Sequence, residues 1–369
     1  MTAPTPSERR LTALRLTAQR IGSAQLATPA AVVRWMLALQ AQDFPGVRWS
    51  VGLRQADGRE AAVEQACDDG SIVRSWPMRG TLHLVAGEDL GWMLALTTPK
   101  AIASLAARRA YLGIADLDAE RAREIAVASL TGGRVLARDR LLAAIEAGGV
   151  PTTGQRGYHL LWFLAQTGTL VLGPTRARQQ TFALLDEWVR APRRLDRDEA
   201  LGELASRYFR SHGPATERDL ARWSGLTLGD VRRGLAVAGA ALTRLELDDQ
   251  VYHLAPETLT ADGPEVTPPR VHLLPGFDEF LLGYADRTAA LPRQWSRAVV
   301  PGGNGMFKPT IVADGRVVGT WRRTVGAAAV VVEATPFEPV AALIRHEAAA
   351  AAERFGAFLG RTPRVAWTA

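Results

Sequence analysis

The segment "HGPATERDLARWSGLTLGDVRRGLAVAGAALTRLELDDQVYHLAP" (residues 212–256) gives the clearest indication of the fold. It contains two helix-capping boxes, each a threonine followed three residues later by an aspartate: Thr216 with Asp219, and Thr227 with Asp230. Gly225 lies between the boxes and is typical of a helix end, and Gly239 marks the next one. The pattern therefore predicts two helices joined by a tight turn.

Two short β-rich runs follow this helix pair, one on each side of Asp248 and Asp249. Such runs around a polar turn predict a β-hairpin. A helix-turn-helix followed by a hairpin is a winged helix, in which the second helix usually enters the major groove of DNA. We predict a winged helix here.

The same order of elements occurs in the first hundred residues. Thr28 and Pro29 predict the start of a helix that extends to about Ala41. A second helix is expected over residues 59–69. The stretch "SIVRSWPMRGTLHLV" (71–85) then alternates like two strands joined by a turn. These elements predict a second winged helix.

A third copy of the pattern lies between these two. "RVLARDRLLAAIEAGG" (134–149) and "YHLLWFLAQTG" (158–168) are expected to be helices. "TLVLGPTRARQQTFALLDEW" (169–188) is expected to form a strand, a Gly-Pro turn and a returning strand.

From about Gly263 onward the sequence favours strands, with a hairpin turn at Asp314-Gly315 and a final helix that closes the chain. The expected fold class is α+β, with three tandem winged-helix motifs packed around a C-terminal β subdomain. The predicted domains are winged helix 1, winged helix 2, winged helix 3 and the β subdomain with its closing helix: residues 1–100, 101–192, 193–262 and 263–369.

The composition favours a soluble, cytoplasmic protein with an anionic partner. The formal charge is +6 and the pI about 10.0. Cys67 is the only cysteine, which excludes an intrachain disulfide. There is no signal-peptide pattern and no apolar run long enough to cross a membrane. No heptad pattern indicates a dimer helix, so a monomer is expected.

Familiar catalytic patterns are missing from the sequence. The 6 histidines are scattered without zinc-ligand spacing, so no metal is expected. There is no dinucleotide-binding or Walker A glycine motif, so no nucleotide cofactor is expected either. The only lysines, Lys100 and Lys308, lie in no recognisable site, which argues against Schiff-base chemistry.

Basic residues in two segments are candidates for contact with DNA. The predicted second hairpin carries Arg176, Arg178 and Gln179 at its tip, and the second helix of the third module carries Arg232 and Arg233. Arginine can neutralise phosphates, and glutamine can bind base edges. The alternative is that these are solvated surface residues.

Five motifs taken together resemble the bacterial winged-helix family of AlkZ-like DNA glycosylases, over nearly the whole chain: "LALQAQ" (37–42), "RSWPMRGTLHLV" (74–85), "HGPATERDLARWSGL" (212–226), "LLPGFDEFLLGYADR" (273–287) and "PTIVADGRVVGTWRR" (309–323). The resemblance implies a concave DNA-binding surface and excision of bulky N7-alkylated purines, including interstrand crosslinks. It also implies an active-site Gln-x-Gln or Gln-x-Asp motif. Gln40-Ala41-Gln42 matches the Gln-x-Gln branch, which includes the self-resistance enzyme of an azinomycin producer.

The chemistry agrees with this resemblance. An N7-alkylated purine is already cationic, so its glycosidic bond breaks without a strong acid. What remains is to hold a water at C1′, which the amides of Gln40 and Gln42 can do. The expected enzyme is a monofunctional DNA glycosylase, a hydrolase that acts on double-stranded DNA with alkylated or crosslinked purines, in base excision repair or antibiotic self-resistance. The alternative for the two glutamines is a polar helix end.

Four further residues are weaker candidates for the lesion pocket. Asp43 is expected to cap a helix first and to act as a base second, because it points away from the glutamines in an extended segment. Arg79, Thr81 and His83 alternate along a predicted strand and could share one side. The alternative is the polar face of a hairpin.

Two other functions compete with the glycosylase. A transcription regulator with three winged helices would bind one DNA sequence without catalysis, and a damage sensor would bend DNA with its Arg176/Arg178 hairpin. Only the glycosylase leaves an abasic site.

Overall fold

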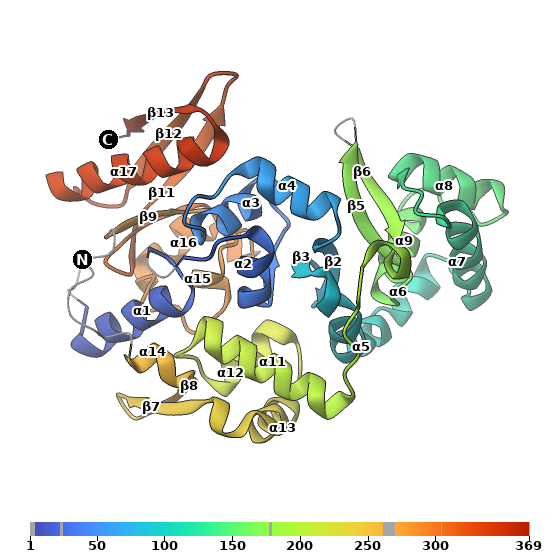
Figure 1. The fold of residues 1–369 in the computed structure, drawn as a ribbon, viewed down its shortest axis with the longest axis horizontal. Helices are drawn as coiled ribbons and strands as arrows, with labels where there is room; N and C mark the ends of the chain where they lie inside the picture. The colour runs from blue at the N-terminus through green and yellow to red at the C-terminus, as the bar shows by residue number, and fades with distance from the viewer. Residues whose placement is uncertain (1–3, 23–24, 177–178, 261–269, 304, 369) are drawn as a thin grey trace. The chain divides into compact units, whose positions relative to one another are not determined.

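The computed structural model describes residues 4–22, 25–176, 179–260, 270–303 and 305–368. It is a mixed α/β protein, and the chain divides into two compact units (Figure 1). The first unit combines Met1–Val63 with Leu201–Ala369, and the second is Glu64–Ala200. The chain therefore leaves the first unit once and returns to it. The predicted domains have other boundaries and stay predictions.

The amino-terminal part of the first unit is helical around one short strand: α1 (Pro6–Ala18), α2 (Pro29–Met36), β1 (Ala38–Gln40) and α3 (Phe44–Leu53). Thr28 caps α2, as predicted. The predicted extension of this helix to Ala41 is wrong. It ends at Met36, because Leu37 has a φ of 67°, outside helical geometry. The predicted second helix is confirmed as α4 (Glu60–Asp68), whereas α3 was not predicted.

The stretch from residue 197 contains three helices and a hairpin: α11 (Arg197–His212), α12 (Glu217–Ser224), α13 (Leu228–Ala238), β7 (Thr243–Leu247) and β8 (Gln250–Leu254). Both predicted capping boxes are present. Gly225 ends α12 with a φ of 80°, a conformation that glycine adopts at little cost. Asp248 and Asp249 form the hairpin turn. The helix pair predicted from the capping boxes and the hairpin predicted from the β-rich runs are both confirmed.

A five-stranded sheet ends the first unit, in the order β13-β12-β11-β10-β9. Its strands are β9 (Val271–Leu274), β10 (Thr310–Ala313), β11 (Arg316–Val325), β12 (Ala329–Pro336) and β13 (Thr362–Trp367). The predicted turn at Asp314-Gly315 joins β10 to β11. The predicted helix is α17 (Ala342–Leu359), but it does not close the chain, because β13 follows it and pairs parallel with β12. Phe355 of α17 packs edge-on against Trp49 and Trp321.

The first unit also contains three short helices: α14 (Pro256–Thr260), α15 (Glu279–Leu282) and α16 (Ser296–Val299).

The second unit contains strands in the order β3-β2-β5-β6-β4. These strands are β2 (Ile72–Met78), β3 (Thr81–Ala86), β4 (Leu136–Ala137), β5 (Leu170–Arg176) and β6 (Gln179–Leu184). Its helices are α5 (Gly87–Ser104), α6 (Ala106–Tyr111), α7 (Asp116–Leu130), α8 (Arg138–Ala147), α9 (Arg156–Gln166) and α10 (Leu185–Trp188).

Both hairpins predicted in this segment are present, as β2–β3 and β5–β6. The predicted Gly-Pro turn is wrong, because Gly173 and Pro174 lie within β5. The register with β6 shifts between Leu172 and Thr175, so the proline occupies an irregularity where a missing N–H is tolerated. The helices α5 to α7 were not predicted. A buried apolar cluster between the helices and the sheet holds this unit together.

Candidate functional site

Gln40 and Gln42 are in direct contact. Gln40 is the last residue of β1 and is 9% exposed, whereas Gln42, just beyond the strand, is exposed. The side-chain Nε2 of Gln40 donates a hydrogen bond to Oε1 of Gln42. Ala41 between them is fully buried, so the two amides lie on the opposite side of the extended segment. The shared face expected for the pair is confirmed, on a strand rather than a helix end.

A buried carboxylate holds the backbone of this motif. Oε1 of Glu279 accepts a hydrogen bond from the backbone N–H of Gln40 at 3.0 Å, and Oε2 accepts one from Nε1 of Trp223 at 2.9 Å. Nε2 of His212 lies 3.6 Å from the same Oε2. Glu279 is only 1% exposed. The carboxylate therefore ties the end of β1 to α12 and α15.

The residue before Glu279 fixes the start of α15. Asp278 caps this helix and forms a two-point ion pair with Arg54, at 2.9 Å for each oxygen. Ser50 donates a third hydrogen bond to the carboxylate. Burial alone would raise the pKa of Asp278, but the Arg54 charge and these hydrogen bonds outweigh it and hold the pKa below its usual value. Asp278 is therefore a structural anchor.

Asp43 caps α3, which is the first of the two roles expected for it. Its Oδ1 accepts a hydrogen bond from the backbone N–H of Gly46 at 3.1 Å. Both carboxylate oxygens also accept from Nη2 of Arg323 on β11, at 3.1 Å each. The carboxylate of Asp43 therefore already accepts hydrogen bonds from Gly46 and Arg323, and a water would have to compete with these donors.

The candidates Arg79, Thr81 and His83 belong to the second unit. Thr81 and His83 are on β3, but Arg79 lies in the preceding turn with a φ of 52°, so the three do not share one strand face. Thr81 donates a hydrogen bond to the carbonyl of Met78, and His83 Nδ1 lies 2.9 Å from the carbonyl of Thr81. His83 is fully buried. A place for them in a lesion pocket stays a prediction.

The predicted groove contacts that the structure describes are exposed residues of β5, β6 and α13. Arg176 ends β5 and pairs with Asp68 at 2.8 Å, Gln179 begins β6, and the predicted contact Arg178 lies outside the described residues. Arg232 and Arg233 are exposed on α13, where Arg232 pairs with Glu217 at 2.8 Å. These positions are compatible with DNA contact, which remains a prediction.

A family model described as DNA glycosylase AlkZ-like matches residues 33–358, which is most of the chain. The chain belongs to the AlkZ-like DNA glycosylase family. The members of this family are named as DNA glycosylases, hydrolases that act on N-glycosyl bonds. The match includes both Gln40 and Gln42.

Individual relatives agree with the family. A protein of Streptomyces sahachiroi named "Interstrand DNA cross-link repair glycosylase" is 29% identical over 306 residues, covering 79% of this chain and 81% of the relative. A solved structure, Streptomyces sahachiroi DNA glycosylase AlkZ, matches with a TM-score of 0.81 and 26% identity over 100% of both chains. No helix in the described part of this chain is long and apolar enough to span a membrane.

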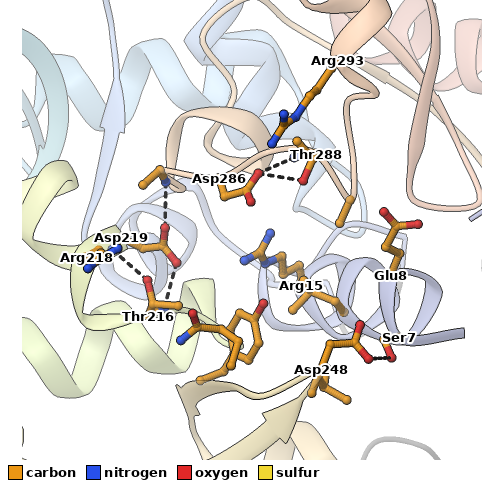
Figure 2. A pocket seen from close by; sticks show the side chains of 16 residues that line it. Ser7, Glu8, Arg15, Thr216, Arg218, Asp219, Asp248, Asp286, Thr288 and Arg293 are labelled. Carbon is orange, nitrogen blue, oxygen red and sulfur yellow. Dashed lines mark hydrogen bonds between the residues drawn. The ribbon is translucent and has the colours of Figure 1, made fainter. Parts of the chain in front are cut away.

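One pocket of the first unit contains none of the predicted site residues. It has a volume of about 570 Å³ and is lined by α1, the start of α12, the β7–β8 hairpin and residues 285–293 (Figure 2). Arg15 lies at its centre, with its guanidinium 3.6 Å from the centre of the Tyr284 ring. Asp219 and Asp286 accept hydrogen bonds from neighbouring residues there. These two aspartates therefore stabilise the backbone around the pocket.

No local sequence pattern indicates Glu279, Trp223 or Arg323 as a neighbour of the site. Glu279 lies in the quoted "PGFDEF" motif, but nothing local links it to Gln40, 239 positions earlier. Arg323 ends the motif "GTWRR" and meets Asp43 from 280 positions away. The resemblance to the family in these motifs was the only available signal.

Proposed function

We propose that this chain is a monofunctional DNA glycosylase that hydrolyses the N-glycosidic bond of bulky N7-alkylated purines, including those that join the strands in interstrand crosslinks. One observation carries the proposal: the Gln40 and Gln42 amides are in contact on a backbone anchored by buried Glu279. These residues form the Gln-x-Gln motif of a chain that belongs to a family of DNA glycosylases. The biological role we propose is base excision repair or self-resistance to an azinomycin-like genotoxin.

The arrangement suits a substrate that is already activated. Alkylation at N7 gives the purine a positive charge, so electrons of the C1′–N9 bond pass to the base as it departs. A water molecule then adds to C1′ and loses a proton to solvent. The two amides orient this water through their oxygens and contact DNA through their NH2 groups. A strong base is not required, because the leaving group is good.

Asp43 is a poorer candidate for the base. Its carboxylate caps α3 and pairs with Arg323. Oδ1 accepts from Gly46 and both oxygens accept from Arg323, so a water would have to compete with these donors for the carboxylate. We therefore assign the positioning of water to Gln40 and Gln42.

The proposed fold for DNA binding is three tandem winged helices around the C-terminal β subdomain. Each hairpin of the expected set follows a pair of helices: β2–β3 follows α3 and α4, β5–β6 follows α8 and α9, and β7–β8 follows α12 and α13. In this proposal Arg176, Arg178, Gln179, Arg232 and Arg233 contact the phosphates or groove edges of DNA.

The test is a single-turnover assay on a duplex with one N7-methylguanine, treated with alkali to cut abasic sites. The assay compares four proteins in the same buffer with EDTA: wild type, Gln40→Ala, Gln42→Ala and Gln65→Ala. Gln65 is an exposed glutamine and serves as the control. We expect cutting by wild type and the control, and about a 100-fold loss in each site variant at unchanged DNA affinity.

If wild type fails on this small adduct, the same assay is repeated with a bulkier N7 adduct. Failure on both adducts, together with tight binding to one DNA sequence, would favour the transcription regulator. Equal loss of binding in both glutamine variants would contradict the role assigned to the amides.

A further inference from the structure

The second unit contains a pocket that the proposed reaction does not use. It has a volume of about 300 Å³ and lies between the β2–β3 turn, the α6 segment and the start of α9. Its lining includes Arg79, Arg108, Gln155, Tyr158, His159 and Trp162. The volume is at the lower end of small-ligand sites, which suits a flat ring better than a large cofactor.

Aromatic rings form one wall of this pocket. His159 and Trp162 on α9 have ring centres 5.5 Å apart and are both nearly buried. Tyr158, beside them, is 50% exposed. Exposed aromatic rings next to buried ones give a flat ligand a surface on which to stack.

One polar atom in the wall has no partner. Nε2 of His159 is buried and makes no hydrogen bond to any residue in the described part of the chain. Burial, with the charges of Arg109 and Arg108, lowers the pKa of His159, so the ring is neutral at pH 7. A buried nitrogen without a partner costs free energy that a bound hydrogen-bonding group would recover.

The rim of the pocket is positively charged. It carries Arg79 and Arg108, and the described lining residues include no aspartate or glutamate. Arg108 donates a hydrogen bond to the side chain of Gln155, which directs its guanidinium toward this rim. The pocket is thus aromatic within and cationic at its edge.

Arg79 occupies a position that folding alone does not favour. It is the first residue of a two-residue hairpin turn, with φ values of 52° for Arg79 and 69° for Gly80. Asparagine, aspartate or glycine are preferred at such a position. A residue whose backbone is held in a strained conformation beside a pocket points to a role in binding.

We propose that this pocket binds one unpaired nucleobase of DNA, stacked on Tyr158 and Trp162 and hydrogen-bonded to His159, with Arg79 and Arg108 on its phosphate. The proposal rests on the proposed function in one respect, that DNA is the partner. It adds a second site of contact with an extrahelical base, in a unit different from the one that carries the two glutamines.

The test compares binding of the full chain to two duplexes. One carries a single unpaired adenine, and the other carries an abasic analogue at the same place, so the affinity ratio measures the contribution of the base. We expect wild type to prefer the adenine duplex by about tenfold, as for one stacked base. Tyr158→Ala and His159→Phe should each remove most of this preference.

The variants are chosen to separate binding from folding. His159→Phe keeps the ring and removes the buried nitrogen, so it should not lower the stability of the protein. The exposed residue Leu117, outside the lining, gives the control Leu117→Ala, which should keep the preference. Arg108→Ala should weaken binding to both duplexes, whereas Arg121→Ala on α7 should not.

Three results would overturn the proposal: no preference in wild type, an undiminished preference in both Tyr158→Ala and His159→Phe, or full displacement of the adenine duplex by micromolar dAMP. The last would identify a free nucleotide as the ligand. Each is distinguishable from failure of the proposed function, because N7-methylguanine excision by the same preparations reports on that function separately.

Discussion

The backbone N–H of Gln40 donates a hydrogen bond of 3.0 Å to Oε1 of Glu279, a carboxylate that is 1% exposed. The same carboxylate accepts from Trp223, so it links the proposed catalytic strand to α12. The hydrogen bond to Gln40 fixes the backbone of this strand end, and with it the point from which the Gln40 side chain projects. Glu279 therefore acts on the proposed reaction by positioning Gln40.

Replacing Glu279 with glutamine should impair excision. The new amide keeps the shape but presents an NH2 group to one of two donors, Gln40 N–H or Trp223 Nε1. We expect single-turnover excision to fall about 10- to 100-fold and the free energy of unfolding to fall by about 1–3 kcal/mol, at unchanged DNA affinity. The exposed Glu353→Gln is the matched control. A loss of stability with normal excision would limit Glu279 to a structural role.

Substitutions of Asp43 should separate its cap from base catalysis. Asparagine is also a good helix cap, so Asp43→Asn should keep α3 and excise within a few-fold of wild type. Asp43→Ala should cost about 1 kcal/mol of stability through loss of the cap. Urea unfolding and single-turnover excision measure the two effects. A 100-fold or larger loss of excision in Asp43→Asn would make Asp43 the base.

The buried Arg54–Asp278 pair should make the stability of the first unit depend on pH in the acid range. The folded-state pKa of Asp278 is lowered, so its contribution to stability is present above the unfolded pKa of about 3.9 and is lost as the pH falls through the lower folded value. In Arg54→Met the carboxylate loses its cation, which should destabilise the protein by about 3–5 kcal/mol at pH 7.

This deficit should depend on pH. Without Arg54, burial raises the pKa of Asp278, so the variant takes up a proton on folding. Its loss of stability relative to wild type should therefore become smaller as the pH falls from 7 to 4. Thermal or urea unfolding across this range measures it. Arg121→Met removes an exposed pair with Glu124 and should change stability by less than about 1 kcal/mol. A deficit independent of pH would contradict the assignment to Asp278.

DNA binding should weaken with salt in proportion to the phosphates contacted. Arg232→Ala and Arg233→Ala on α13 should each reduce the slope of log affinity against log salt by about 1. Fluorescence anisotropy at several salt concentrations gives the slope, with Arg121→Ala as the control. Unchanged slopes in both variants would remove α13 from the DNA interface.

Local sequence patterns determined the elements that depend on neighbouring residues. The boxes at Thr216 and Thr227 specify where α12 and α13 begin, because each threonine satisfies backbone donors three residues away. The Asp248-Asp249 turn and the two hairpins of the second unit follow from similarly short-range rules. The shared face of Gln40 and Gln42 also follows, since side chains alternate along extended backbone.

The surroundings of those glutamines depend on contacts between distant parts of the chain. The helix before them ends early at Leu37, and β13 joins the sheet after a helix that was expected to be last. Glu279 reaches Gln40 across 239 positions, and Arg323 reaches Asp43 across 280. Such partners leave no periodic pattern in either segment, because each contact arises only when distant parts of the chain pack together and bury their polar groups in pairs.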